Sequence, residues 1–234
     1  MDNPKSICII PARGGSKRIP RKNVLPLNGV PLLAYTIRAA RDAKVFDEIL
    51  VSTEDEEIKQ VALNEGVGVD DRPMHMAGDK VTKVQVVKEY IGRTNAMEKY
   101  DIIAALLPTC PFRTAEDVRA AYELFIGQSV HSFLVGVVAY DFPIQLALSL
   151  EENEQVVSML DSASYLTTRS QDIAKRYHPN GAMYIATIDA FLKKGTFFNE
   201  AMLAYVMSAE KSFDIDYPYQ FEIAEAMAKR LKIK

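Results

Sequence analysis

An apolar strand that opens directly into a cationic loop constrains this chain more than any other feature of its sequence. The β-branched run Ile7–Ile10 is typical of a buried strand. The segment that follows, residues 11–23, contains two glycines, two prolines and five cationic side chains: Arg13, Lys17, Arg18, Arg21 and Lys22. Glycines let backbone N–H groups approach an anion closely, and cations neutralise its charge. We therefore predict a phosphate-binding loop, and the alternative is an exposed basic turn in solvent.

Two common phosphate-binding motifs do not fit this loop. The P-loop needs a Gly-Lys-Ser/Thr sequence, whereas residues 15–17 read Gly-Ser-Lys, in the wrong order. The dinucleotide fingerprint needs three spaced glycines that open a helix at once. Here three prolines hold off the first helix until about Leu32: Pro20, Pro26 and Pro31. The loop is long and extended, which suits a triphosphate and argues against a redox dehydrogenase.

Composition narrows the class of protein further. The 234 residues suit one α/β domain, and the net charge of −3 argues against general nucleic-acid binding. Cys8 and Cys110 are too few and too far apart for a disulfide framework, so we expect reduced thiols that fill apolar space. The polar N-terminus and the lack of any run of about twenty apolar residues predict a cytoplasmic protein without a membrane span.

Strand and helix patterns alternate along the N-terminal part of the chain. After Ile7–Ile10, apolar periodicity predicts these elements in order: helix 32–43, strand 46–52, helix 55–64, helix 83–90, strand 102–107, helix 114–126 and strand 133–139. Side chains that favour helix starts precede the last three helices: Thr53 or Glu54, Thr82 and Thr114. This order predicts a doubly wound, mostly parallel sheet with helices on both faces, which is a three-layer, Rossmann-like α/β fold.

The alternation breaks after about residue 140. Residues 145–150 and 155–160 read as a hairpin, and Asn180-Gly181 is typical of a turn that leads into a strand at 183–186. A strand at 204–207 and a closing helix from about Pro218 follow. We predict one domain over residues 1–234, with a small protruding subdomain at about 140–175.

Two aspartates near the C-terminus indicate a metal site. Residues two apart in an extended chain point to the same side, so Asp214 and Asp216 can face one cavity while Phe213 and Ile215 face the core. Mg²⁺ takes one or two carboxylates and completes its octahedron with water and phosphate oxygens. An edge strand with ordinary polar alternation would have the same pattern, but the cationic loop favours the metal.

The loop and the aspartates together indicate nucleotidyl transfer. In this reaction a sugar hydroxyl attacks the α-phosphate of a nucleoside triphosphate, and pyrophosphate leaves. We expect Arg13, Lys17 and Lys22 to contact the triphosphate and to stabilise its charge. Either aspartate could accept the proton of the hydroxyl, and Asp216 is the first choice.

The segment from Pro11 to Asn23, PARGGSKRIPRKN, resembles the signature loop of the CMP-acylneuraminate cytidylyltransferases and of their bacterial relatives that act on legionaminic and pseudaminic acids. The resemblance extends along nearly the whole chain and implies a nucleotide-diphospho-sugar transferase-like fold. It implies CTP and an acidic nine-carbon sugar as substrates, Mg²⁺ with Mn²⁺ as a possible substitute, and a homodimer in which the 140–175 subdomain leans over the partner's cleft. The resemblance implies that Asp214 and Asp216 bind the metal. It implies that the nucleotide is bound by Ala12, Arg13, Gly14, Ser16, Lys17, Lys22, Asn23, Arg72, Asp79 and Thr82.

The same resemblance implies that the sugar is bound by Thr109, Gln145, Arg169, Asn180, Gly181, Tyr184, Phe197 and Phe198. Arg169 would bind the sugar carboxylate, and the two phenylalanines would line an acyl pocket, although such a pair is more often plain core. Three positions depart from the sialic-acid pattern and leave the identity of the sugar open: Leu107, Gln145 and His178. His178 is expected to have a polar or structural role, and His75 and His131 a structural one, since they lack partners for a transition-metal site.

Two alternatives remain open. One is a cytidylyltransferase for a shorter ulosonic acid, and the other is a nucleotide-binding regulatory protein without turnover. The presence of both Asp214 and Asp216 argues against the regulatory protein, because a binder without catalysis has less need of a positioned metal.

Overall fold

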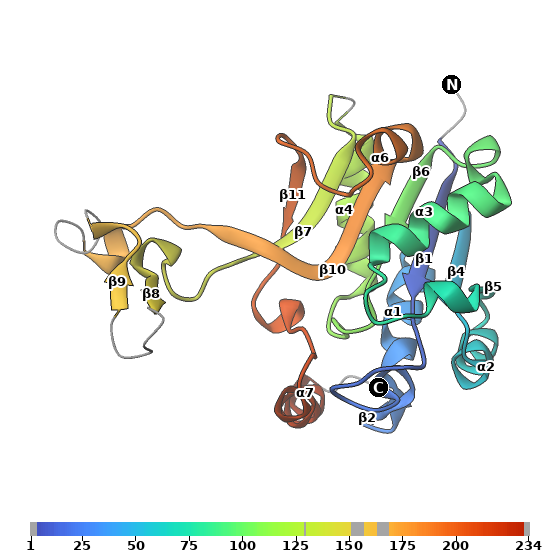
Figure 1. The fold of residues 1–234 in the computed structure, drawn as a ribbon, viewed down its shortest axis with the longest axis horizontal. Coiled ribbons are helices and arrows are strands. Elements are labelled where there is room, and N and C mark those ends of the chain that lie inside the picture. Colours follow the sequence, from blue (N-terminus) through green and yellow to red (C-terminus); the bar gives the residue numbers. More distant parts are fainter. Residues whose placement is uncertain (1–3, 129, 151–156, 163–168, 232–234) are drawn as a thin grey trace.

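The computed structural model describes residues 4–128, 130–150, 157–162 and 169–231, and a seven-stranded sheet lies at its centre (Figure 1). The strand order is β11-β7-β10-β6-β1-β4-β5. The bounds of these strands are β1 Ser6–Pro11, β4 Glu48–Thr53, β5 Gly68–Asp71, β6 Ile102–Ala105, β7 Phe133–Ala139, β10 Tyr177–Thr187 and β11 Leu203–Val206. All neighbouring pairs are parallel except those of β10, which runs antiparallel to both β6 and β7. The predicted mostly parallel sheet is confirmed.

Helices cover both faces of the sheet, as Figure 1 shows. Their bounds are α1 Leu32–Ala43, α2 Glu56–Asn64, α3 Lys83–Thr94, α4 Ala115–Ile126, α6 Ile188–Lys194 and α7 Pro218–Leu231. One core joins Cys8 and Ile10 of β1 to α1, α2 and α4, and a second core joins Ile7 and Ile9 to α3 and α6. Alternate side chains of β1 thus enter opposite cores, as the pleat of a strand requires. The predicted three-layer fold is confirmed, while α6 and β5 were not predicted.

The first helix begins where the prolines allow it. A short hairpin, β2 Pro26–Leu27 and β3 Val30–Pro31, precedes α1, which starts at Leu32 as predicted. The closing helix α7 packs through Ala224 and Ala228 against a small third core that contains Leu27 and Ile215. The C-terminal helix thus packs against the segment that follows the cationic loop.

Four described helices begin at side-chain caps, α2, α3, α4 and α6, and the cap of α2 differs from the prediction. Thr82 and Thr114 cap α3 and α4, each in a reciprocal capping box. The cap of α2 is Asp55, whose carboxylate accepts the N–H of Ile58 at 3.1 Å, and not Thr53 or Glu54. Thr53 is still part of β4, and Glu54 directs its carboxylate elsewhere, to the N–H of Gly14.

Between β7 and β10 the chain leaves the sheet and forms an arm that projects from the body (Figure 1). We use the word arm for the described residues between 140 and 176. Its strands, β8 Leu148–Leu150 and β9 Val157–Met159, pair with each other in an antiparallel hairpin of their own. The predicted hairpin was too long at its start, because Ile144–Leu146 form a 3-10 helix, η4, directly after Pro143.

The Asn-Gly pair is not a turn, and this prediction was wrong. Asn180 and Gly181 lie inside the long strand β10, at a bulge where the register against β7 shifts between Pro179 and Tyr184. Gly181 has a φ of 76°, which suits a residue without a Cβ. The bulge bends β10 at the carboxyl edge of the sheet, which brings it close to the segment around Asp214.

The remaining predictions concern the cysteines and membrane spans. Cys8 and Cys110 are both unpaired and buried, as expected of apolar filler. Burial raises the pKa of both thiols, that of Cys110 to about 12, so neither is a reactive thiolate at neutral pH. Among the described helices, none has the length and apolar character that a bilayer crossing requires.

Candidate active site

The cationic loop, residues 12–21, leaves the carboxyl end of β1 and forms one wall of a cavity of about 340 Å³. The residues that line this cavity are Arg13, Ser16, Lys17, Arg18, Lys22, Asp79 and Asp216. The fold thus brings together the N-terminal loop, a residue that precedes α3, and the C-terminal aspartate. Parallel strands place their carboxyl ends at one edge of the sheet, which is where open α/β sheets bind ligands. We call this space the cationic cavity.

Two carboxylates neutralise the cations of this cavity. Asp79 pairs with Arg13 at 3.0 Å and also with Lys17. Asp216 pairs with Arg18 and with Lys22, each at 3.1 Å. A triphosphate that enters the cavity can exchange with these carboxylates and take over four cationic partners. The cations are therefore held at the site before a ligand arrives, which lowers the cost of ordering them.

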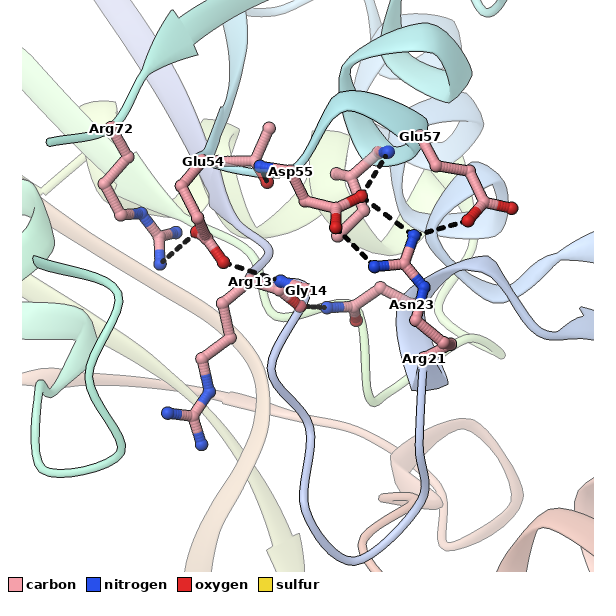
Figure 2. Close-up of polar contacts among 10 residues, drawn as sticks. Arg13, Gly14, Arg21, Asn23, Glu54, Asp55, Glu57 and Arg72 are labelled. Atoms are coloured by element: carbon pink, nitrogen blue, oxygen red, sulfur yellow. Dashed lines mark hydrogen bonds and ion pairs between the residues drawn. The ribbon is translucent and has the colours of Figure 1, made fainter. Parts of the chain in front are cut away.

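The backbone of the loop is held from both sides at the peptide that joins Arg13 to Gly14 (Figure 2). The carbonyl of Arg13 accepts a hydrogen bond from Asn23 Nδ2 at 2.9 Å, and the N–H of Gly14 donates to Glu54 Oε1 at 2.8 Å. A Cβ on Gly14 would overlap the carboxylate of Asp55 and lie 2.9 Å from its Cγ, so only glycine fits at this position. Asn23 was predicted to bind the nucleotide. In the structure its side-chain amide donates to the backbone of the loop, so it also has a structural role.

Lys22 joins this loop to the segment that carries the two aspartates. Its side chain is only 11% exposed, and its Nζ donates to the carbonyl of Ile215 at 2.6 Å as well as to Asp216. The N–H of Ile215 in turn donates to the carbonyl of Thr109 at 2.8 Å. The loop, the turn after β6 and the aspartates therefore form one connected wall.

Asp214 and Asp216 lie on neighbouring cavities rather than on one. We expected both to face a single cavity, but Asp214 lines a second cavity of about 530 Å³, together with Tyr140, Phe142 and His178. Ile215 between them is fully buried, so the chain at this point is the partition between the two spaces. One carboxylate is thus available to each side of the partition.

The carboxylate of Asp214 is incompletely satisfied. Burial raises its pKa above the ordinary value, whereas a hydrogen bond from Thr109 and the charges of Lys22 and Arg113 lower it by less. Its Oδ1 is buried, and no described residue forms a hydrogen bond with it. A buried anionic oxygen without a partner is costly unless a cation or a substrate donor completes it.

Arg72 and Thr82 are the remaining residues that the resemblance assigns to the nucleotide. Arg72 is 5% exposed and donates from Nε to Ser52 Oγ at 3.3 Å, while its Nη1 is 3.9 Å from Glu54 Oε2. Thr82 uses its hydroxyl in the capping box, where it accepts the N–H of Gln85 at 3.3 Å. The next residue, Lys83, places its Nζ 4.2 Å from the centre of the Tyr184 ring and near Asp214.

The residues assigned to the sugar divide into three groups. Thr109 and Gly181 lie beside Asp214, at the partition between the cavities. Asn180 and Phe197 are structural in position: Asn180 is 3% exposed and bonds Ser212 and the N–H of Ala182, and Phe197 is fully buried against Phe191. Tyr184 and the partly buried Phe198 contact each other edge to face at 5.9 Å.

Gln145 and Arg169 form the third group, because both belong to the arm. Gln145 donates from Nε2 to the carbonyl of Ala174 at 3.1 Å, and Arg169 is exposed. The hairpin of the arm projects away from the body in Figure 1. Nothing within the described chain brings these two side chains to Asp214.

His178 lies on the second cavity, where its ring is 4.6 Å from that of Tyr140. Its Nδ1 is 3.0 Å from the carbonyl oxygen of Pro179. The described residues contain no group of three or more histidines, cysteines, aspartates and glutamates that could hold a metal by themselves.

The sequence did not indicate three residues that the structure places at this site: Glu54, Lys83 and Arg113. Arg113 is 3% exposed and donates to the carbonyls of Leu107 and Ala182 and to the hydroxyl of Thr36. Its position directly after the proline-rich turn that follows β6 was the available signal. The partners of Arg113 and Glu54 are far away in the sequence, so local patterns could not reveal them.

The sequence is similar to known cytidylyltransferases over nearly its whole length. A family model described as cytidylyltransferase matches residues 7–233. A pseudaminic acid cytidylyltransferase from Campylobacter jejuni is 38% identical over 227 residues, which are 96% of this chain and 97% of that protein. An N-acylneuraminate cytidylyltransferase from Escherichia coli is 34% identical over 221 residues, or 94% of this chain and 51% of that protein.

A solved structure of another protein has a similar fold. The structure of CMP:2-keto-3-deoxy-manno-octonic acid synthetase complexed with CTP superposes with a TM-score of 0.72 at 16% identity, covering 97% of this chain and 99% of that one. At this identity the similarity concerns the fold alone.

Proposed function

Because the chain belongs to the cytidylyltransferase family, we propose that it transfers CMP from CTP to the anomeric hydroxyl of a nonulosonic acid and releases pyrophosphate. The observation that carries the proposal is the partition at residues 214–216, with a cationic cavity on one side and a second cavity on the other. The first cavity suits a triphosphate, and the second is the space for the sugar. CTP as donor and two unpaired cysteines support a cytoplasmic location.

The chain's own residues would act mainly by holding charge in place. Arg13, Lys17 and Lys22 would bind the triphosphate and stabilise the charge that develops as the α-phosphate is attacked. The hydroxyl oxygen forms a bond to the α-phosphorus while the bond to pyrophosphate breaks, and the hydroxyl proton moves to a carboxylate. Asp214 is better placed than Asp216 to take it, because it lines the second cavity. This reverses the preference that the sequence suggested.

We propose Mg²⁺ at the partition, held by Asp214 and Asp216, with Mn²⁺ as a possible substitute. The residues fit this ion: Asp214 Oδ1 is a buried carboxylate oxygen without a hydrogen-bond partner among the described residues, and Asp216 faces the cationic cavity. When bound, the ion would withdraw charge from the phosphate and make the attacking hydroxyl more acidic. Phosphate oxygens and water would complete its octahedral coordination.

The identity to the Campylobacter jejuni relative favours pseudaminic acid as the first sugar to test. Leu107 and Gln145 replace an amide and an ammonium of the sialic-acid pattern, and sites that lose such donors change their sugar preference strongly. The structure places Leu107 beside Gly181, at the partition. Selectivity is therefore expected to arise at this point and from the arm.

Pyrophosphate release tests the proposal. With CTP and Mg²⁺ we expect release with one nine-carbon acid from a panel of pseudaminic, legionaminic and N-acetylneuraminic acids, and none without sugar. Release with 3-deoxyoctulosonic acid alone would identify a cytidylyltransferase for a shorter ulosonic acid. CTP binding without release with any sugar would identify a nucleotide-binding protein without turnover. Both results would contradict the proposed activity.

We also propose a homodimer in which the arm of one chain covers the second cavity of the other. Nine apolar side chains of the arm and its base are exposed: Tyr140, Phe142, Ile144, Leu148, Leu150, Val157, Met159, Leu160 and Tyr177. An apolar surface of this kind is typical of a protein interface. A partner's arm would also supply Gln145 and Arg169, which no described part of the same chain brings to the site.

Sedimentation or light scattering at micromolar concentration should give a mass of two chains of 26.2 kDa. Leu148→Lys with Leu150→Lys should shift the protein to the monomer and reduce turnover, because charges cannot be buried at the interface. Met74→Lys is the matched control, since Met74 is 78% exposed on the body and should tolerate lysine. A fully active monomer would refute the arrangement.

A further inference from the structure

Glu54 contacts two parts of the proposed nucleotide site, the loop at Gly14 and the buried Arg72. Its negative charge is unfavourable there, because the phosphates of a nucleotide are also negative. It lies between β4 and α2, and its side chain is 11% exposed. Its Oε1 accepts the N–H of Gly14 at 2.8 Å, and its Oε2 is 3.9 Å from Arg72 Nη1 and has no hydrogen bond within the described chain (Figure 2). A carboxylate beside a site for a polyanion repels the ligand, so its presence needs an explanation.

The first contact fixes the peptide from which Arg13 projects. The carbonyl of this peptide is held by Asn23, and its N–H is held by Glu54, so both polar atoms of one peptide plane are engaged (Figure 2). The neighbouring Asp55 packs against Gly14 and binds Arg21 through two carboxylate oxygens. Rotation of the peptide would therefore break two hydrogen bonds and move the Arg13 guanidinium within the cationic cavity.

The second contact compensates a buried guanidinium. Arg72 is almost completely buried, and burial lowers its pKa, while Glu54 is the strongest of the charges that raise it again. Arg13 is also near enough to repel Arg72. The carboxylate of Glu54, 3.9 Å from Arg72 Nη1, offsets this repulsion and helps to keep Arg72 charged in its buried position.

We propose that Glu54 is a positioning residue for CTP: it fixes Arg13 and Arg72 in their binding geometry before the nucleotide arrives. This inference rests on the proposed function, because it assumes that the cationic cavity binds CTP. The benefit is preorganisation, since residues already held in place lose less entropy on binding.

Substitution of Glu54 separates positioning from repulsion. If charge repulsion dominated, Glu54→Gln would strengthen CTP binding. Glutamine can accept the N–H of Gly14, but its NH₂ group then faces the N–H groups of Arg72, so it cannot serve both partners. Positioning therefore predicts a dissociation constant for CTP about tenfold higher, because the ion pair with Arg72 is lost and an amide N–H group faces the guanidinium instead. KM for CTP should rise by a similar factor with little change in kcat, because the contacts exist before the reaction.

Glu57→Gln is the matched control. Glu57 is three residues away, contacts Arg21 of the same loop, and does not contact Gly14 or Arg72. The same change of charge at this exposed position should leave CTP binding unchanged or slightly stronger. Glu54→Asp is the second variant: it keeps the charge and shortens the side chain, so positioning predicts weaker binding and repulsion predicts no change.

The titrations would be carried out by calorimetry on full-length variants whose thermal unfolding matches that of the wild type. Binding to Glu54→Gln as tight as, or tighter than, binding to the wild type would overturn the inference. If that variant does not fold, the titration of Glu54→Asp decides in the same way. A wild-type protein that neither binds CTP nor releases pyrophosphate would instead refute the proposed function, so the two failures are distinguishable.

Discussion

Asp214→Asn is expected to abolish turnover and at the same time to make the fold more stable. Removal of the carboxylate takes away the proposed proton acceptor and one ligand of the proposed ion, which should lower kcat by about 100-fold or more. The gain in stability follows from burial. The raised pKa of Asp214 means that the cost of burying its charge exceeds the attraction of Lys22 and Arg113. A neutral side chain of the same shape removes that cost.

The pH dependence of this gain has a definite sign. A carboxyl group whose pKa is raised by folding reduces the stability of the native state as the pH rises through that pKa. The difference in unfolding free energy between Asp214→Asn and the wild type should therefore be largest at neutral pH and shrink in acid, where the wild-type carboxyl takes up a proton. Thermal unfolding in a chelator at several pH values measures it.

Asp216→Asn is the matched control for both effects. Asp216 is 46% exposed and pairs with Arg18 and Lys22, so its loss leaves two cations without a partner and brings no gain in stability. Turnover should fall in this variant as well. Turnover within tenfold of the wild type in Asp214→Asn would contradict the catalytic role proposed for Asp214. A lower melting temperature would contradict the proposed cost of burying its charge.

Features set by nearby residues could be predicted from the sequence. The alternating apolar runs predicted a mostly parallel sheet between two layers of helices, and Thr82 and Thr114 were predicted as helix caps. Caps and periodicities depend on contacts within about one helical turn, so a short window of sequence contains them. The loop after β1 was found in the same way, since its glycines and cations are adjacent.

Features set by distant contacts could not be predicted. Asn180-Gly181 has the local signal of a turn, yet Asn180 is held by Met207 and Ser212, and β10 continues through a bulge. The cap of α2 is a different case: Asp55 is itself a favoured cap residue, and only the contact of Glu54 with Gly14, 40 residues earlier, is tertiary. In β10, by contrast, tertiary hydrogen bonds outweigh the local preference.

Arg113→Met is expected to destabilise the fold more than any other single substitution considered for this chain. The guanidinium is buried and donates to Thr36, Leu107 and Ala182, which belong to α1, the turn after β6 and the bulge of β10. Methionine fills a similar space but leaves these acceptors without a donor. We expect a loss of about 3–5 kcal/mol: three buried acceptors left without a donor cost about 1–3 kcal/mol each, and removal of a buried charge, whose pKa burial lowers, offsets part of this loss. For a chain of this length, that is a fall in melting temperature of roughly 10 °C or more.

Two further variants identify which property of Arg113 matters. Arg113→Lys keeps the charge, but its single ammonium group cannot reproduce the fork that reaches three acceptors, so it should recover only part of the stability. Arg38→Met is the control, because Arg38 is 34% exposed on α1 and pairs with Glu65, and such a pair contributes about 1 kcal/mol or less. Urea denaturation measures all three variants. If the free energy of unfolding of Arg113→Met is within about 1 kcal/mol of that of the wild type, the guanidinium does not hold the partition together. The positions of Thr109 and Gly181 around Asp214 must then be set by backbone packing alone.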